Sequence, residues 1–164
     1  MPRRRVRHDG IIATVELGRL LLMTETAALE SLQRAKRAGV SAIKSLPETP
    51  LTAAGFNLRF RFDSPPDELL RGMNTPIDNR ISDGGFSIRA RSLRRSLALD
   101  PGLLNVEVRQ PDGDDTVVEL NFHRQSTAAE ELCSWLEMPD DRLKDAAQRA
   151  FACICGSDFK ETLE

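Results

Sequence analysis

The stretch LTAAGFNLRFRF, residues 51–62, decides the fold of this chain. Its second half strictly alternates apolar and polar side chains: Phe56, Leu58, Phe60 and Phe62 against Asn57, Arg59 and Arg61. Such alternation is typical of a strand that buries one face of a sheet and leaves the other face to water or a partner. The stretch TVVELNFHR, residues 116–124, repeats the pattern. Because the strands of a doubly wound parallel sheet are apolar on both sides, these segments favour an antiparallel sheet.

Four further segments are predicted as strands: residues 11–17, 20–23, 86–90 and 104–108. The second of these is predicted to continue the first beyond a bulge at Gly18. Residues 110–115, QPDGDD, are predicted to form a hairpin loop, because Pro fixes φ and Asp-Gly accepts the left-handed conformation. Two segments fit either a strand or a helix: Val40–Leu46 and Ser92–Leu99.

Helices are predicted where apolar residues recur at helical spacing: residues 24–39, 64–73 and 127–156. Thr127 and Glu130 are predicted to form a capping box at the start of the last helix, and Pro139 is predicted to divide that helix into two. The chain is therefore predicted to be an α+β protein. Its architecture is an antiparallel sheet of four to six strands, packed on one face by helices that include a long broken C-terminal helix.

The length of 164 residues fits one domain. We predict a flexible basic arm over residues 1–9 and a single α+β domain over residues 10–164. Residues 74–85 show no apolar periodicity. We therefore predict that they form a mobile loop.

Composition and charge exclude several classes of protein. Apolar residues make up 40% of the chain and charged residues 29%, which is ordinary for a soluble globular protein. The net charge of −2 argues against a dedicated nucleic-acid binder, as does the lack of aromatic residues on the polar side of the predicted strands. No apolar run reaches the roughly 18 residues that span a bilayer, so no membrane partner is predicted.

The cysteines predict a reducing environment. There are three of them, Cys133, Cys153 and Cys155, in a chain that shows no secretory segment. An odd number of cysteines in such a context fits free thiols and a cytoplasmic location. No His or Cys group has the spacing of a metal site, so neither a metal nor a cofactor is predicted.

The polar side of the predicted sheet is the first candidate site. If the strands are neighbours, this surface gathers Arg59, Arg61, Arg89, Arg91, Arg109, Asn121 and His123. Because arginine forms bidentate contacts to carboxylate and phosphate, the surface is predicted to bind a protein or a small anionic ligand. The alternative interpretation is a solvated face held together by cross-strand ion pairs.

The predicted loop is the second candidate site. It carries four polar residues before a Gly-Gly pair: Asp78, Asn79, Arg80 and Asp83. Loops of this kind can close over a ligand or contact one directly. The glycines do not precede a predicted helix, and the acids do not follow the calcium-loop pattern, so neither a phosphate cradle nor an EF-hand is predicted.

Motifs for catalysis are missing from the sequence. There is no nucleophile elbow, zinc-protease helix, P-loop or dinucleotide fingerprint. His123 has no metal ligand close in sequence, and it lacks the orienting acid and nucleophile that a catalytic histidine needs. No catalytic residue is assigned, and the question of an enzyme stays open with the balance against it.

The sequence therefore predicts a cytoplasmic, bacterial-type, non-catalytic binding or assembly module that acts through a charged sheet face or a sheet edge. Its partner is predicted to be another protein or a second copy of the chain, in a homodimer formed by an edge strand such as Ile11–Leu17 or by helix packing. Two alternatives stay open. One is a small anionic-ligand binder or enzyme with a pocket between the sheet and the C-terminal helix, and the other is a weak nucleic-acid binder.

Overall fold

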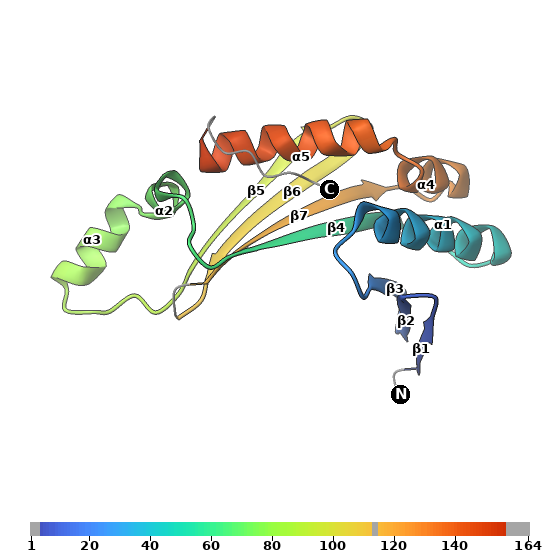
Figure 1. Ribbon diagram of the computed structural model, residues 1–164, viewed down its shortest axis with the longest axis horizontal. Coiled ribbons are helices and arrows are strands. Elements are labelled where there is room, and N and C mark those ends of the chain that lie inside the picture. The colour runs from blue at the N-terminus through green and yellow to red at the C-terminus, as the bar shows by residue number, and fades with distance from the viewer. Residues whose placement is uncertain (1–3, 113–114, 157–164) are drawn as a thin grey trace. The chain divides into compact units, whose positions relative to one another are not determined.

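The computed structural model describes residues 4–112 and 115–156 (Figure 1). Over these residues the chain forms an α+β fold with two antiparallel sheets, of three and four strands, and five helices. The predicted class and the antiparallel pairing are confirmed, although the strands divide between two sheets. In chain order the elements are β1 (Arg4–His8), β2 (Ile11–Glu16), β3 (Arg19–Thr24), α1 (Leu29–Ser45), β4 (Ala53–Phe62), α2 (Asp67–Met73), α3 (Pro76–Asp83), β5 (Arg91–Leu99), β6 (Gly102–Gln110), β7 (Thr116–Gln125), α4 (Ala129–Leu136) and α5 (Asp140–Cys155).

Residue contacts group the chain into two compact units. The first unit contains the described residues up to Ala54 together with Gln125–Met138, and the second contains Gly55–Arg124 and the described residues from Pro139 onward. The first unit therefore holds the three-stranded sheet with α1 and α4. The second holds most of the four-stranded sheet with α2, α3 and α5. The prediction of a single domain over residues 10–164 stays a prediction.

In the first unit, residues 4–8 form strand β1 where the sequence predicts a flexible arm. They pair antiparallel with β2 through a turn at Asp9-Gly10, where φ is +48° and +72°. Two successive positive φ values are typical of the type I′ turn, whose twist matches that of a hairpin, and Asp-Gly is a preferred sequence for it. Residues 1–3 of the predicted arm lie outside the described residues.

The apolar run at residues 20–23 turns back on the strand before it. Gly18 has a φ of +73°, and the chain reverses there into β3, which pairs antiparallel with β2. The predicted bulge is wrong because a glycine between two apolar segments permits a tight turn as readily as a bulge. The strand order is β1-β2-β3. The segment Ile11–Leu17 thus supplies the central strand, so it is not the sheet edge that the homodimer prediction invokes.

The segment Val40–Leu46, which the sequence leaves open between strand and helix, belongs to helix α1 as far as Ser45. It packs against α4, the first half of the predicted broken helix. Gly39 permits a close approach, since a Cβ there would lie 3.2 Å from the Leu136 side chain. The buried Lys36 donates from Nζ to the main-chain oxygen of Met138 at 2.7 Å. This hydrogen bond satisfies a carbonyl just beyond the end of α4, where helical partners run out.

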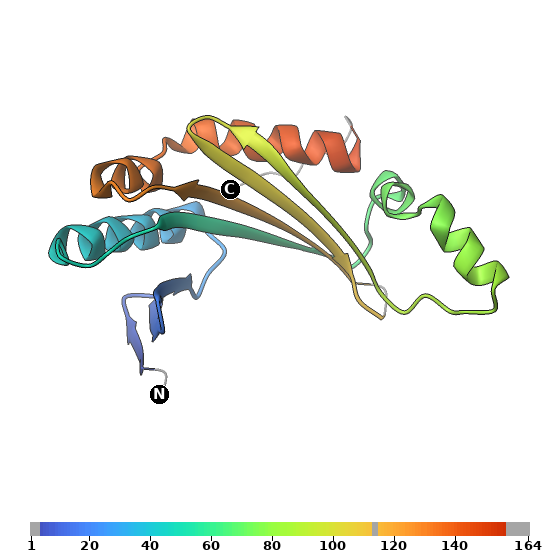
Figure 2. The ribbon, with the colours of Figure 1, turned by 180° about the vertical axis from the view of Figure 1, so that it is seen from behind.

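In the second unit, the four-stranded sheet has the strand order β4-β7-β6-β5 (Figure 2). β6 pairs antiparallel with both β5 and β7. Ser92–Leu99 is therefore a strand, which settles the second ambiguous segment. The predicted strand at residues 86–90 is wrong, because these residues carry no regular structure and β5 begins at Arg91. Residues 113 and 114 of the predicted hairpin loop lie outside the described residues.

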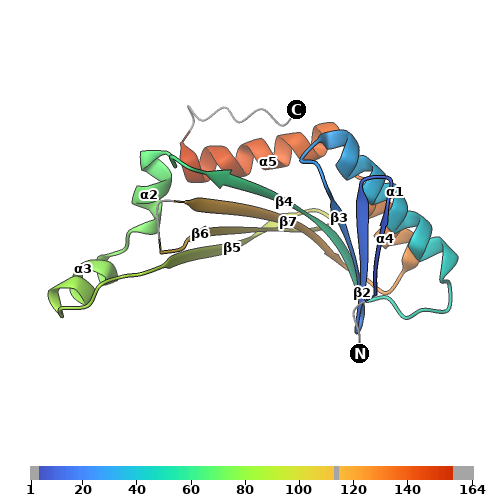
Figure 3. The ribbon, with the colours of Figure 1, turned by 60° about the horizontal axis from the view of Figure 1, so that its bottom comes forward.

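One face of this sheet carries the core of the second unit. Val108, Val118, Leu120 and Phe122 on β6 and β7 are fully buried. Phe56 stacks on Phe122 with the ring centroids 4.9 Å apart. Helix α5 lies along this face (Figure 3), and its Phe151 meets Phe60 of β4 edge to face at 4.6 Å. The strict alternation in β4 and β7 therefore buries one face, as predicted.

The predicted mobile loop at residues 74–85 contains a helix, α3. Its start is marked by Thr75-Pro76 and Asp78, in which the Asp78 carboxylate accepts hydrogen bonds from both the main-chain N (3.2 Å) and the side-chain Oγ1 (3.1 Å) of Thr75. Proline fits the first helical turn because its missing N–H has no partner there in any case. The prediction of a loop is wrong because it depends on apolar periodicity, and this eight-residue helix has only two aliphatic residues besides its proline, Ile77 and Ile81.

Candidate binding face

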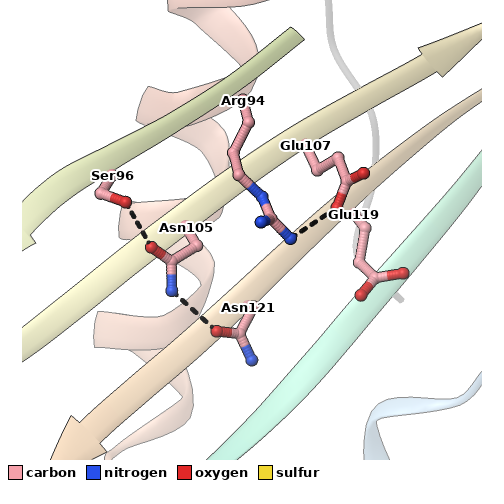
Figure 4. A pocket seen from close by; sticks show the side chains of 6 residues that line it. All are labelled: Arg94, Ser96, Asn105, Glu107, Glu119 and Asn121. Carbon is pink, nitrogen blue, oxygen red and sulfur yellow. Dashed lines mark hydrogen bonds and ion pairs between the residues drawn. The ribbon is translucent and has the colours of Figure 1, made fainter. Parts of the chain in front are cut away.

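The second face of the four-stranded sheet carries polar side chains from all four strands. Figure 4 views this face with a helix behind the strands. The side chains are held in two neighbouring rows, an amide row and a charged row, which run across the strands. We call the whole surface the polar face. Its central members are Asn57 and Arg59 of β4, Glu119 and Asn121 of β7, Asn105, Glu107 and Arg109 of β6, and Arg94 and Ser96 of β5.

The amide row crosses the sheet by hydrogen bonds that all run in one direction. Ser96 Oγ donates to Asn105 Oδ1 at 2.7 Å, and Asn105 Nδ2 donates to Asn121 Oδ1 at 2.9 Å. Asn121 Nδ2 in turn donates to Asn57 Oδ1 at 2.5 Å. Ser96, Asn105 and Asn121 are direct cross-strand neighbours in the register of β5, β6 and β7, and the hydrogen bond from Asn121 extends the row to Asn57 of β4.

The charged row lies beside the amide row. Arg94 Nη2 lies 3.1 Å from Glu107 Oε2. Glu119 Oε2 accepts from Arg59 Nη2 at 2.7 Å and from Arg109 Nη2 at 3.1 Å. Arg109 Nε also lies 3.7 Å from Glu107 Oε1, which joins the pairs into one network. Three arginines and two glutamates leave the row only slightly positive.

A shallow hollow lies between the two rows. Its volume is about 350 Å³, and it is lined by Arg94, Ser96, Asn105, Glu107, Glu119 and Asn121 (Figure 4). The lining offers hydrogen-bond donors and acceptors together with charges of both signs. It has no aromatic or aliphatic side chain of the kind that dominates enclosed small-molecule sites. The hollow is suited to polar groups of a larger partner.

The structure brings together only part of the predicted surface. Arg59, Arg109 and Asn121 belong to the two rows, and Arg61 and His123 lie on the same face by strand alternation. Arg61 forms a salt bridge with Asp115, the residue before β7. Most of these arginines therefore already have acidic partners, which agrees with the alternative interpretation of cross-strand ion pairs.

Two predicted arginines lie elsewhere. Arg91 pairs with Gln110 in the register and precedes Leu93 by two positions, which places it on the apolar side of β5. Its placement on the polar surface is a wrong prediction, because residues 86–91 do not continue one strand phase. Arg89 comes before β5, and its Nη1 lies 3.4 Å from an Asp112 oxygen.

Of the six residues that line the hollow, only Asn121 is among the candidates predicted from the sequence; the other five are Arg94, Ser96, Asn105, Glu107 and Glu119. The first two lie in the segment that the sequence left open between strand and helix. Had that segment been taken as a strand paired with the next one, its even-numbered residues would have fallen on the polar side. The missing information is therefore the register of β5 against β6.

The loop candidates belong to α3 and do not line the hollow. Asp78 caps the helix and also accepts a hydrogen bond from Arg91 Nε at 3.1 Å. This hydrogen bond from Arg91, together with the one from the Thr75 main chain, lowers the pKa of Asp78 below its ordinary value. Asp78 is thus explained as a structural residue. Asn79, Arg80 and Asp83 are exposed, and their predicted ligand contact stays a prediction.

The described ranges contain neither a metal-binding cluster nor a membrane-spanning helix. No group of three or more His, Cys, Asp or Glu residues there could hold a metal ion. Among those residues, no helix has both the length and the apolar character needed to cross a bilayer. Comparison of the chain with family models, curated proteins and solved structures finds no match.

Proposed function

We propose that this chain is a non-catalytic binding or assembly module whose polar face contacts another protein. The observation that supports it is the pair of ordered rows across all four strands, with a hollow between them. Side chains that already hold one another in place lose little conformational entropy when a partner arrives. Such a face can offer a fixed pattern of donors and acceptors at a low ordering cost.

The charge balance favours a protein over a small anion. A phosphate in the hollow would meet the carboxylates of Glu107 and Glu119 as well as the Arg94 guanidinium. The negative charges of the two carboxylates would repel the phosphate and oppose its binding. A protein surface, in contrast, can present both signs of charge in matching positions, and this complementarity contributes more to specificity than to raw affinity. The same balance disfavours the nucleic-acid alternative, which needs net positive charge.

The packing of α5 disfavours the pocket alternative. Phe151 of this helix contacts Phe60 at 4.6 Å and Phe62 at 6.3 Å between ring centroids. Aromatic rings thus fill the space between helix and sheet at this point, where the alternative requires a cavity. We therefore propose the polar face, and not the face covered by α5, as the binding surface.

We place this function in the cytoplasm. In the described part of the chain, Cys133, Cys153 and Cys155 are all free thiols, and Cys153 is exposed. An exposed free thiol is better tolerated in a reducing compartment than outside the cell. Fractionation of native cells tests this placement, and recovery with secreted proteins would contradict it.

The proposal is tested by affinity purification of the tagged protein from native cells, followed by quantitative mass spectrometry. The key variant is Asn121→Arg, which puts a bulky charge in the middle of the amide row. The matched control is Arg149→Glu on the exposed side of α5, where the arginine makes an i,i+4 ion pair with Asp145 and no other ion pair with a described residue.

We expect a stoichiometric partner with the wild type and with the control, and at least a tenfold loss of that partner with Asn121→Arg. Equal recovery with all three proteins would contradict the role of the polar face. Recovery of no partner by any of them, together with a monomer mass in solution, would contradict the binding function itself.

Self-association is the second form of the proposal, and it too predicts a specific measurement. Sedimentation equilibrium at micromolar concentration should give twice the monomer mass if a second copy is the partner. A monomer mass leaves a different protein as the partner.

A further inference from the structure

The three-stranded sheet has an open edge at β1. The strand order ends at β1, so its outer side has no neighbouring strand among the described residues. The type I′ turn at Asp9-Gly10 makes the flanking His8 and Ile11 the expected hydrogen-bonded pair. Because hydrogen-bonded and non-hydrogen-bonded pairs alternate in an antiparallel ladder, the backbone groups of Arg5 and Arg7 point to the open side.

The side chains along this edge divide into a basic and an apolar set. Arg5 and Arg7 lie on one face of the sheet, and Val6 lies on the other. Arg7 forms a salt bridge with Glu25 at 2.6 Å yet stays 74% exposed, whereas Arg5 has no acidic partner among the described residues. Val6 is 62% exposed. At the centre of this edge, an incoming strand would therefore meet Arg5 and Arg7 on one face of the sheet and Val6 on the other.

The apolar set continues inward from the edge. Val15 of β2 and Leu20 of β3 are cross-strand neighbours on the Val6 face, and they are 58% and 45% exposed. Protective charges at a sheet edge would account for the arginines alone. They do not account for aliphatic side chains left exposed beside them, and a contiguous exposed apolar patch is typical of an interaction surface.

A second copy of β1 is a poor occupant of this edge. An antiparallel pair centred on Val6 would place Arg5 of one chain directly opposite Arg7 of the other. The remaining residues of the strand, Arg4 and His8, are basic too. Like charges directly opposite one another destabilise a strand pair.

We infer that β1 accepts an extended segment of another protein in which acidic and aliphatic residues alternate. The segment adds as a fourth, antiparallel strand, with its acids opposite Arg5 and Arg7 and an aliphatic side chain beside Val6. Main-chain hydrogen bonds supply affinity, and the alternate side chains supply specificity, as in other cases of strand addition. This site is separate from the polar face and does not depend on it.

The test uses a fluorescein-labelled peptide of sequence Ser-Glu-Val-Glu-Val-Glu-Ser and the full chain, followed by fluorescence anisotropy. We expect saturable binding, and at least a tenfold weaker affinity for a peptide in which lysine replaces glutamate. N-methylation of the glutamate nitrogens should abolish binding, because those N–H groups meet Arg5 and Arg7. N-methylation of the valine nitrogens should be tolerated, because those N–H groups point away.

Protein variants complete the test. Arg5→Glu should weaken binding about tenfold, while Arg149→Glu and the polar-face variant Asn121→Arg should leave it unchanged. Absence of binding, indifference to glutamate N-methylation, or equally tight binding of a single-stranded oligonucleotide would overturn the inference. The peptide changes need no altered protein, so a variant that fails to fold cannot mask the result. Because Asn121→Arg should lack effect here, failure of this inference is distinguishable from failure of the proposed function.

Discussion

The two sheets of this molecule differ in how far their apolar side chains are buried. In the four-stranded sheet, the apolar residues of β6 and β7 are fully buried, and the opposite face is tied together by the amide and charged rows. In the three-stranded sheet, Val6, Val15, Leu20 and Met23 are all exposed, as is Leu17 in the turn between β2 and β3.

This difference shows that an alternating sequence specifies a strand. The elements that pack on the sheet decide whether the apolar side chains of that strand are buried. A sheet with its apolar face covered gains stability from burial and can use its polar face for recognition. A sheet with exposed apolar groups gains less, and it keeps surface that a partner can still bury.

Truncation of apolar side chains should show most clearly that the two sheets contribute differently to the free energy of unfolding. Phe122→Ala removes a fully buried ring that stacks on Phe56, and we expect a loss of about 3–5 kcal/mol in the free energy of unfolding. Val6→Ala, in the exposed sheet, should change it by less than about 0.5 kcal/mol. Urea unfolding followed by circular dichroism measures both. Similar losses for the two variants would mean that both sheets contribute equally to the stable core.

Glycine substitutions test how closely β4 and β7 approach each other. A Cβ at Gly55 would lie 2.5 Å from the main-chain oxygen of Phe122, so Gly55→Ala should destabilise the protein by about 1–3 kcal/mol. Gly72→Ala in helix α2 is the matched control, because a Cβ there meets nothing within 4 Å. It should stabilise the protein by about 0.5–1 kcal/mol. If both variants melt at the same temperature, the close approach is not a constraint.

The amide row should contribute moderately to stability. Asn121→Ala removes one hydrogen bond to Asn105 and one to Asn57, and we expect a loss of about 1–2 kcal/mol. Thr14→Ala, on the central strand of the three-stranded sheet, should cost less. Thermal unfolding of the two variants gives the comparison, and a larger effect at Thr14 would contradict the assignment of the ordered rows to the four-stranded sheet.

The smallest effect concerns pH and Asp78. Its pKa is lowered, chiefly by the hydrogen bond from Arg91, so the folded state binds its proton more weakly than the unfolded chain. The stabilisation is present above the unfolded pKa of about 3.9 and is lost as pH falls through the lower, folded value. The difference in melting temperature between the wild type and Asp78→Asn should therefore shrink on acidification. A difference independent of pH would contradict this role of the carboxylate.

Much of the fold could be predicted because strands and helices that bury one face show a periodic pattern of apolar residues in the sequence. Phe56, Phe122 and Leu120 alternate with polar residues, and Pro139 interrupts the last helix, so β4, β7, α4 and α5 follow from local pattern. The type I′ turn at Asp9-Gly10 also has a recognisable sequence. The basic residues before it, which are typical of a flexible arm, obscure this signal.

The rest depends on pairing between distant segments. The division into two sheets depends on which strands become neighbours, which no single segment encodes. The polar face was predicted in outline from Arg59, Arg109 and Asn121, but its hollow also needs Ser96 and Asn105, whose positions follow from the register of β5 against β6. Helix α3 was missed because its capping residues, rather than an apolar stripe, define it.

The proposed role of the polar face is tested most directly by site-specific photo-crosslinking in native cells. A benzophenone amino acid replaces Ser96 on the polar face in one protein and Arg149 on α5 in a second. The proposal predicts that light produces a discrete cross-linked protein from the Ser96 position and none from the Arg149 position. A cross-link from Arg149 alone, or from neither position, would contradict it.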